Sequence, residues 1–223
     1  RVNVPRKWRE PFISSLQRFQ LGESGEGRHL RKLAAATGDA PYAAAIELFI
    51  REEQRHAELM AGVLKRLDAP LLTSHWSDKA FTFMRHLPGL HTELLVLLLP
   101  EMIAKIYFRA LAGHFDDPAI ATVAAQILED EEGHLAFHAH YLNEVLSRIP
   151  FGRRILLQIG WRCAYRAVCL VVYSDHRTLL QLLGMTLPKF WSECGEVFDE
   201  VAAKIFSPAH VLGRAIFPIE SRA

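Results

Sequence analysis

The chain has 223 residues, of which 50% are apolar, so it is large enough to bury one sizeable hydrophobic core. Its 26 basic and 25 acidic residues give a formal charge of +1, which excludes a global field that attracts nucleic acid or an anionic membrane. The three cysteines, Cys163, Cys169 and Cys194, lack C-x-x-C spacing, which argues against a disulfide framework or a cysteine-based metal site and favours the cytoplasm.

Apolar residues recur at steps of three and four over long stretches, and strand signals are scarce, so we expect an all-α protein. In chain order the expected helices cover residues 11–37, 41–69, 78–115, 118–148, 153–183 and 188–206. The first four predict a bundle over residues 1–150, and the rest predict a C-terminal helical extension over 151–223 that packs on it. The longest apolar runs, 94–100 and 169–173, are too short to span a bilayer, so no transmembrane segment is expected.

In each of the four expected bundle helices, an acidic or histidine side chain interrupts the apolar stripe near the middle of the helix. A lone carboxylate in a low-dielectric core costs several kcal/mol unless it is paired or bound to a metal. Two of the helices carry the pattern E-x-x-H, whose three-residue spacing directs both side chains to one place. The residues concerned are Glu23, Glu53 with His56, Glu101, and Glu131 with His134.

The spacing of these acids supports the same site. Glu23 precedes Glu53 by 30 residues and Glu101 precedes Glu131 by 30, so the midpoints, residues 38 and 116, fall on the two predicted turns. In an antiparallel hairpin, residues equidistant from the turn lie at equal height, here about 22 Å from it. A constant offset of 78 residues relates the two halves, which indicates an internal repeat about a pseudo-two-fold axis.

Four carboxylates and two imidazoles suit two ions of iron, or alternatively manganese, better than a structural zinc ion. We expect Glu53 and Glu131 to bridge the metals and to be the catalytic pair, with Glu23 and Glu101 as terminal ligands and His56 and His134 completing one ion each. Glu52 and Asp130, one position before each bridging acid, are candidates to accept the outer imidazole N–H of a histidine.

Several positions stay open. Glu26 shares the stripe of Glu23 and could replace it, although its spacing breaks the repeat, and Glu93 is a second choice for Glu101. His138 is an additional ligand, a proton donor near the ligands, or a core histidine bonded to a carbonyl, the last being favoured. Pro100 marks a kink before Glu101 or a fresh helix start. Three glycines, Gly22, Gly25 and Gly27, leave space beside the metals or allow close helix packing.

The pattern Glu, E-x-x-H, Glu, E-x-x-H over residues 10–148 resembles the ferritin-like di-iron carboxylate superfamily. Residues 52–56 also resemble the form found in ribonucleotide reductase small subunits and bacterial multicomponent monooxygenases. The compact size is closer to demethoxyubiquinone hydroxylase, bacterioferritin and rubrerythrin. This resemblance implies a ferritin-like antiparallel four-helix bundle and chemistry at two iron ions, without selecting one member family.

The expected function is that of a non-haem di-iron oxidoreductase, which uses O2 to oxidise or hydroxylate a small, mainly apolar substrate. A separate electron donor is needed, because the sequence has no flavin motif and no iron–sulfur cysteine set. The alternative is an iron-handling ferroxidase or peroxidase without an organic substrate. Nucleic acid is not expected as a partner, and a homodimer is possible. The arginines of residues 153–177 are expected to form a solvated face rather than an anion site.

Overall fold

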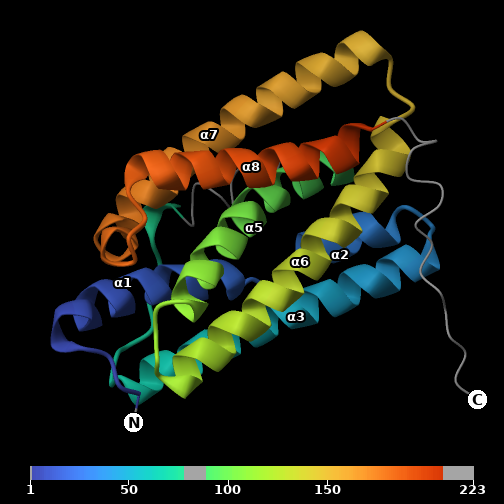
Figure 1. The fold of residues 1–223 in the computed structure, drawn as a ribbon. Coiled ribbons are helices and arrows are strands. Elements are labelled where there is room, and N and C mark those ends of the chain that lie inside the picture. Colours follow the sequence, from blue (N-terminus) through green and yellow to red (C-terminus); the bar gives the residue numbers. More distant parts are fainter. Residues whose placement is uncertain (1, 78–88, 208–223) are drawn as a thin grey trace, which may run out of the picture.

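The computed structural model describes residues 2–77 and 89–207, and within these ranges every regular element is a helix. The all-α prediction is therefore confirmed. In chain order the helices are α1 (Arg6–Glu23), α2 (Arg28–Ala35), α3 (Ala40–Arg66), α5 (Leu90–Ala112), α6 (Pro118–Leu146), α7 (Phe151–Leu182) and α8 (Leu187–Phe206) (Figure 1). Residues 78–88, where the third expected helix begins, and the tail from 208 lie outside the described residues.

The first expected helix, 11–37, is wrong in one respect, because it is two helices. The first ends at Glu23 and the second begins at Arg28. Gly27 has φ +64°, a left-handed conformation, and an added Cβ would lie 2.7 Å from the side chain of Ile50. Glycine is required there by both conformation and space, so the helix cannot continue through this segment. Glu23 thus becomes the last residue of α1.

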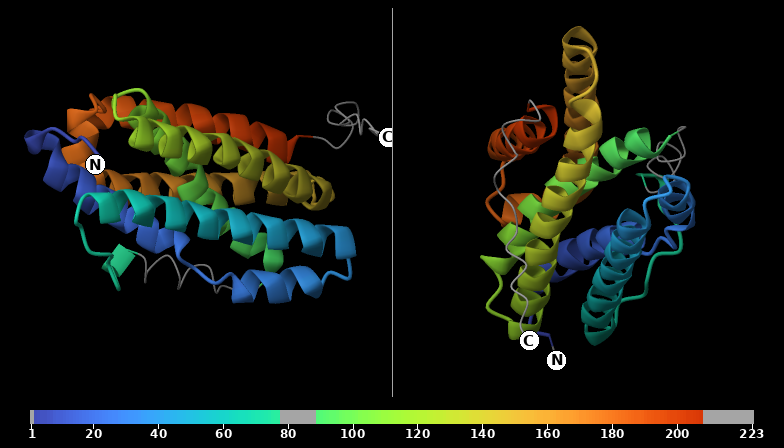
Figure 2. Two further views of the ribbon diagram at one scale, coloured as in Figure 1. Left: turned by 90° about the horizontal axis from the view of Figure 1, so that it is seen from below. Right: turned by 90° about the vertical axis from the view of Figure 1, so that its right-hand side faces the viewer.

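Side-chain caps fix the two turns about which the repeat was predicted. Asp39 precedes α3 and accepts a hydrogen bond from the backbone N–H of Tyr42 at 2.9 Å. Asp117 precedes α6 and accepts from the N–H of Ala119 at 3.0 Å. Each cap is followed by a proline in the first helical turn, where its missing N–H costs nothing. The chain therefore reverses at both places, packing α1 and α2 on α3, and α5 on α6 (Figures 1 and 2).

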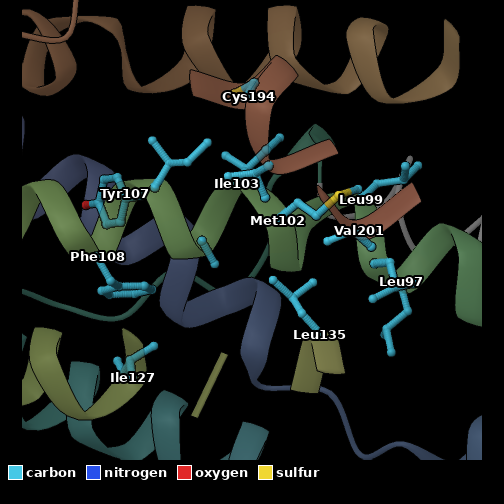
Figure 3. Packing of buried hydrophobic residues seen from close by; sticks show 14 of the residues in the cluster. Leu97, Leu99, Met102, Ile103, Tyr107, Phe108, Ile127, Leu135, Cys194 and Val201 are labelled. Carbon is cyan, nitrogen blue, oxygen red and sulfur yellow. The ribbon is translucent and has the colours of Figure 1, made fainter. Parts of the chain in front are cut away.

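Helix α5 is the central element. Figure 3 shows its side chains between α8, which contributes Cys194 and Val201, and α6, which contributes Ile127 and Leu135. Most residues of α5 are buried, and the buried residues lie on all sides of the helix, as expected for a helix that is apolar all round. Pro100 lies inside this uninterrupted helix, so the alternative of a fresh helix start before Glu101 is wrong.

Helices α7 and α8 are tied to the bundle by specific hydrogen bonds. The indole N–H of Trp161 on α7 donates to the carbonyl of Leu95 on α5 at 2.8 Å. The amide of Asn143 on α6 donates to the carbonyls of Ile205 and Ser207 at the end of α8, at 3.0 and 2.9 Å. Buried residues of both helices belong to the same hydrophobic core as those of the bundle.

Helix α7 departs from the expectation that no segment of the chain is long and apolar enough to span a bilayer. By length and composition it could cross a bilayer, although the longest apolar runs of the sequence are short. Of its most apolar 18-residue window, 17% is buried inside the protein.

Candidate metal site

The two E-x-x-H motifs meet in the middle of the bundle. Glu53 and His56 lie on α3, Glu131 and His134 lie on α6, and Glu101 approaches from α5. One donor atom from each of Glu53, Glu101, Glu131 and His134 lies within 4.8 Å of the others. Side chains far apart in the sequence therefore converge on a volume about as large as a metal centre needs.

His56 completes the group from the other side. Its Nδ1 atom lies 3.6 Å from Oε1 of Glu53 and 3.8 Å from Oε1 of Glu131. The Nδ1 atom of His134 lies 3.2 Å from Oε1 of Glu53 and 3.5 Å from Oε2 of Glu101. The Nδ1 atom of His134 also lies 3.9 Å from Oε2 of Glu131, so both imidazoles present the same nitrogen to Glu53 and Glu131.

Glu23 and Glu26, the two candidate ligands near the end of α1, lie in different surroundings. Glu23 lines the cavity that reaches Glu53 and Glu101, and its charge acts on Glu131. Glu26 lies beyond the end of α1, is 67% exposed and pairs with Arg28. The alternative in which Glu26 replaces Glu23 therefore loses its geometric basis.

The outer nitrogen of each histidine faces an acid from the opposite half of the repeat. Nε2 of His56 lies 3.0 Å from Oδ2 of Asp130, and Nε2 of His134 lies 2.9 Å from Oε2 of Glu52. An ionised carboxylate only accepts, so each Nε2 carries the proton and donates it. Nδ1, which faces the central carboxylates, is therefore the nitrogen of each ring that can lose its proton and bind a metal ion.

The electrostatics of the cluster are those of acids held together at close range. Burial and the charges of Glu101, Glu53 and Glu23 raise the pKa of Glu131 well above its usual value. Burial alone would raise the pKa of Glu101, but the close approach of Glu131 and His134 outweighs it and lowers that pKa to about 2. Burial opposes protonation of His134, yet the nearby carboxylates of Glu101 and Glu53 raise its pKa to about 11. Without a metal, the cluster holds protons in place of cations.

The donor set fits two divalent cations. The inward Nδ1 atoms of His56 and His134 and both carboxylate oxygens of Glu131 have no hydrogen-bond partner among the described residues. The same holds for Oε1 of Glu53 and Oε2 of Glu101. Buried polar atoms without partners are costly, and a metal ion supplies the missing partner to all of them at once. Carboxylate oxygen with imidazole nitrogen is the donor set that suits iron and manganese.

His138 lies one turn after His134 and is fully buried. The favoured expectation, a bond to a carbonyl, is wrong, because neither ring nitrogen has a hydrogen-bond partner among the described residues. Its ring packs edge-on against Phe49 at 4.7 Å, and burial lowers its pKa to about 4, so it is neutral at physiological pH. A neutral imidazole of this kind keeps a lone pair on one ring nitrogen.

A cavity of about 360 Å³ leads from the carboxylates toward α7. Glu23, Glu53 and Glu101 line it, and so does Gly22, where an added Cβ would meet nothing within 4 Å. A side chain would therefore have room at this position. Much of the remaining wall is apolar, contributed by Phe19, Leu97, Leu99, Ile103, Ala164, Ala167, Val168, Val171 and Val172.

Two polar arrangements near the site were missed from the sequence. His29 on α2 bonds to the buried carboxylate of Glu93 at 2.6 Å, so Glu93 has a partner outside the cluster. Ser15 joins the hydroxyl of Tyr107 at 2.8 Å to Nδ1 of His176 at 2.7 Å, and His176 lines the cavity. The only available signal for the second was a histidine at helical spacing in the buried stripe of residues 161–180.

Comparisons with known proteins add a structural relative. No family model and no curated protein matches the chain. A solved structure from Synechococcus, described as a protein with aldehyde deformylating oxidase activity, is similar with a TM-score of 0.65 and 17% identity. The likeness covers 92% of this chain and 94% of that one. At this identity the likeness shows the fold, and it confirms the predicted ferritin-like helical bundle with its additional C-terminal helices.

Proposed function

We propose that the protein is a non-haem di-iron oxidoreductase that uses O2 to oxidise a small, mainly apolar molecule. The observation that supports this most directly is that one apolar cavity reaches the carboxylates. Glu23, Glu53 and Glu101 line its inner end, together with Phe19 and Leu97. A protein that only stores or oxidises iron has no need for such a cavity, whereas an enzyme that acts on an organic substrate needs one to bind it.

In this proposal Glu53 and Glu131 would be shared by the two ions, Glu23 and Glu101 would each bind one ion, and His56 and His134 would bind through Nδ1. When bound, two iron ions supply the reductive activation of dioxygen, with electrons from a separate donor. Asp130 and Glu52 hold the imidazole rings in the tautomer that binds metal. Apolar walls hold the substrate beside the acids and exclude water from the reacting end.

The cavity provides an experiment that separates this function from the iron-handling alternative. Ala164 is exposed, lines the cavity and is not a proposed ligand, and a tryptophan in its place would fill part of the cavity. Ala203 on α8 is likewise exposed and lies outside the cavity lining, so Ala203→Trp is the matched control. Because the similar structure is described by an activity on aldehydes, aliphatic aldehydes of increasing length are the first probes.

Iron-loaded protein with a chemical reductant is expected to consume O2 faster when a fitting aldehyde is added. Ala164→Trp is expected to keep its iron and to lose most of this stimulation, while Ala203→Trp keeps both. If O2 consumption depends on ferrous iron alone and is the same in both variants, the iron-handling function is correct instead.

A further inference from the structure

Helix α7 presents an apolar stripe that no described residue covers. Exposed apolar side chains recur along one face at steps of three and four, including Leu156 (70% exposed), Ile159 (55%) and Leu170 (51%). The positions between them on that face are small and also exposed, namely Gly160, Cys163 and Ala167. A soluble monomer rarely exposes a continuous apolar stripe of this length, so it marks a docking surface.

The opposite face of the same helix is fixed on the protein. Trp161, Tyr165, Cys169, Tyr173 and His176 follow at steps of three and four and are buried. Lipid therefore cannot surround the helix as it surrounds a membrane-spanning one, despite its length and composition. The first ten residues of α7 include no buried side chain, and in the figures these turns stand clear of α8 (Figures 1 and 2).

Charge favours an anionic partner. Between Phe151 and Ser174, α7 carries four arginines and no acid. Arg162 and Arg166 are used internally, bonding to Asp199 and to the carbonyl of Trp191 on α8. Arg153 and, one turn after this segment, Arg177 are exposed near the two ends of the apolar stripe. In a second copy of the chain packed antiparallel on this face, Arg153 would approach the same charge on Arg177, which disfavours that occupant.

The cavity opens beside this stripe. Ala167 and Val171 belong both to the exposed face of α7 and to the cavity lining. Trp76 also lines the cavity and is 56% exposed, and tryptophan is a favoured residue at the boundary between lipid and water. A protein partner seated on the stripe would obstruct this opening, whereas a fluid bilayer would extend the apolar environment into it.

We propose that the apolar stripe of α7 is a membrane-docking surface, which lays the helix along a phospholipid bilayer with the cavity opening toward the lipid. The apolar side chains enter the boundary between headgroups and acyl chains, and Arg153 and Arg177 meet anionic headgroups. The docking surface stands apart from the metal chemistry. Entry of an apolar substrate from the bilayer through the opening rests on the proposed function.

Vesicle flotation of the full chain tests this directly. One set of vesicles is phosphatidylcholine, and the other contains equal parts of phosphatidylcholine and phosphatidylglycerol. The protein is expected to float with both and to bind the anionic set more tightly, with a preference that decreases at high salt. The double variant Leu156→Glu/Ile159→Glu is expected to weaken binding more than about tenfold, because two exposed apolar side chains that would enter the bilayer are replaced by charged ones.

A matched variant controls for the added charge. Leu48 on α3 is 59% exposed and lies on a helix that contributes nothing to the stripe, so Leu48→Glu is expected to float like the parent protein. The pair Arg153→Gln/Arg177→Gln is expected to remove the preference for anionic vesicles and to retain binding to phosphatidylcholine. Thermal unfolding of all variants verifies that they are folded.

Three kinds of result would overturn the proposal. The first is a flotation result against it: either the parent protein floats with neither set, or the Leu156→Glu/Ile159→Glu variant floats as well as the parent. The second is a dimer in light scattering that this variant dissociates, without vesicle binding, which assigns the stripe to a second copy. The third is vesicle association that resists alkaline carbonate, which assigns α7 to a membrane-spanning state. Each assay runs without substrate and with or without iron, so its failure leaves the proposed function standing.

Discussion

The imidazole of His56 on α3 donates through Nε2 to the carboxylate of Asp130 on α6, at 3.0 Å. The residue with the same place in the other half, His134, bonds to Glu52 at 2.9 Å. Each acid directly precedes the proposed bridging glutamate of its own helix, yet it orients the histidine of the opposite helix. The two halves of the site therefore hold each other in register.

Breaking one of these crossed pairs is expected to weaken metal binding. Asp130→Asn can offer its amide N–H to His56, which favours the tautomer with the proton on Nδ1 and removes the inward lone pair. Iron affinity is expected to decrease by about 10- to 100-fold, as is common for partners of metal-binding histidines. A titration of the metal-free protein with ferrous iron measures this. Glu132→Gln, two positions away and exposed beside Lys105, is the control, and equal losses in both would contradict the orienting role.

The two acids near the end of α1 give a second comparison. Glu23→Ala removes a proposed ligand and is expected to reduce iron affinity by more than the loss of an outer partner does. Glu26→Ala removes a solvent-exposed side chain that pairs with Arg28, so it is expected to leave iron binding within about twofold of the parent. Iron content after loading and desalting measures both. A larger loss in Glu26→Ala would reverse the assignment.

His176 is expected to make stability depend on pH. Burial lowers its pKa to about 3, so the folded protein keeps it neutral while the unfolded chain takes up a proton near its ordinary value. Stability from this group is complete above about pH 6.5 and decreases at lower pH by about 1.4 kcal/mol per pH unit.

His176→Gln keeps an amide for Ser15 and removes the titrating group. The difference in unfolding free energy between parent and variant, from urea titrations at several pH values, isolates this contribution from that of the acids. A difference that is the same at pH 7 and at pH 4 would contradict the assignment.

Asn143 is expected to matter for stability without affecting the metal. Its amide satisfies the carbonyls of Ile205 and Ser207 at the end of α8. Asn143→Ala leaves both without this donor in a buried setting and is expected to cost about 1–3 kcal/mol. Urea unfolding measures the loss, and iron loading per folded chain is expected to be unchanged. A variant as stable as the parent would show that water replaces the amide fully.

Much of the fold could be predicted because its signals are local. Asp39 and Asp117 cap helices that begin with a proline beside them, and such caps are visible in any sequence. Once both turns were placed, the equal spacings of Glu23 from Glu53 and of Glu101 from Glu131 predicted that the acids lie at one level. The grouping of Glu53, Glu101, Glu131 and His134 followed from helical geometry alone.

Other features depend on contacts between distant segments. The break after Glu23 is followed by Gly27 with its left-handed φ, and the approach of Ile50 of α3, which leaves no room for a Cβ there, cannot be predicted from a local pattern. The cavity depends on how α7 lies across α1 and α5, and the partner of Glu93 depends on where α2 places His29. The apolar run of α7 is divided by arginines, so its exposed stripe became visible only when its opposite face was seen to be buried.

The most direct test of the central claim is a crystal structure of the iron-loaded protein with anomalous diffraction data collected at the iron absorption edge. The proposed function predicts two anomalous peaks between α3 and α6, each bound by Nδ1 of one histidine, His56 or His134, and bridged by Glu53 and Glu131. Glu53→Ala crystals treated identically are expected to lose at least one peak. Loaded crystals with no peak among these side chains would contradict the assignment of a di-iron site.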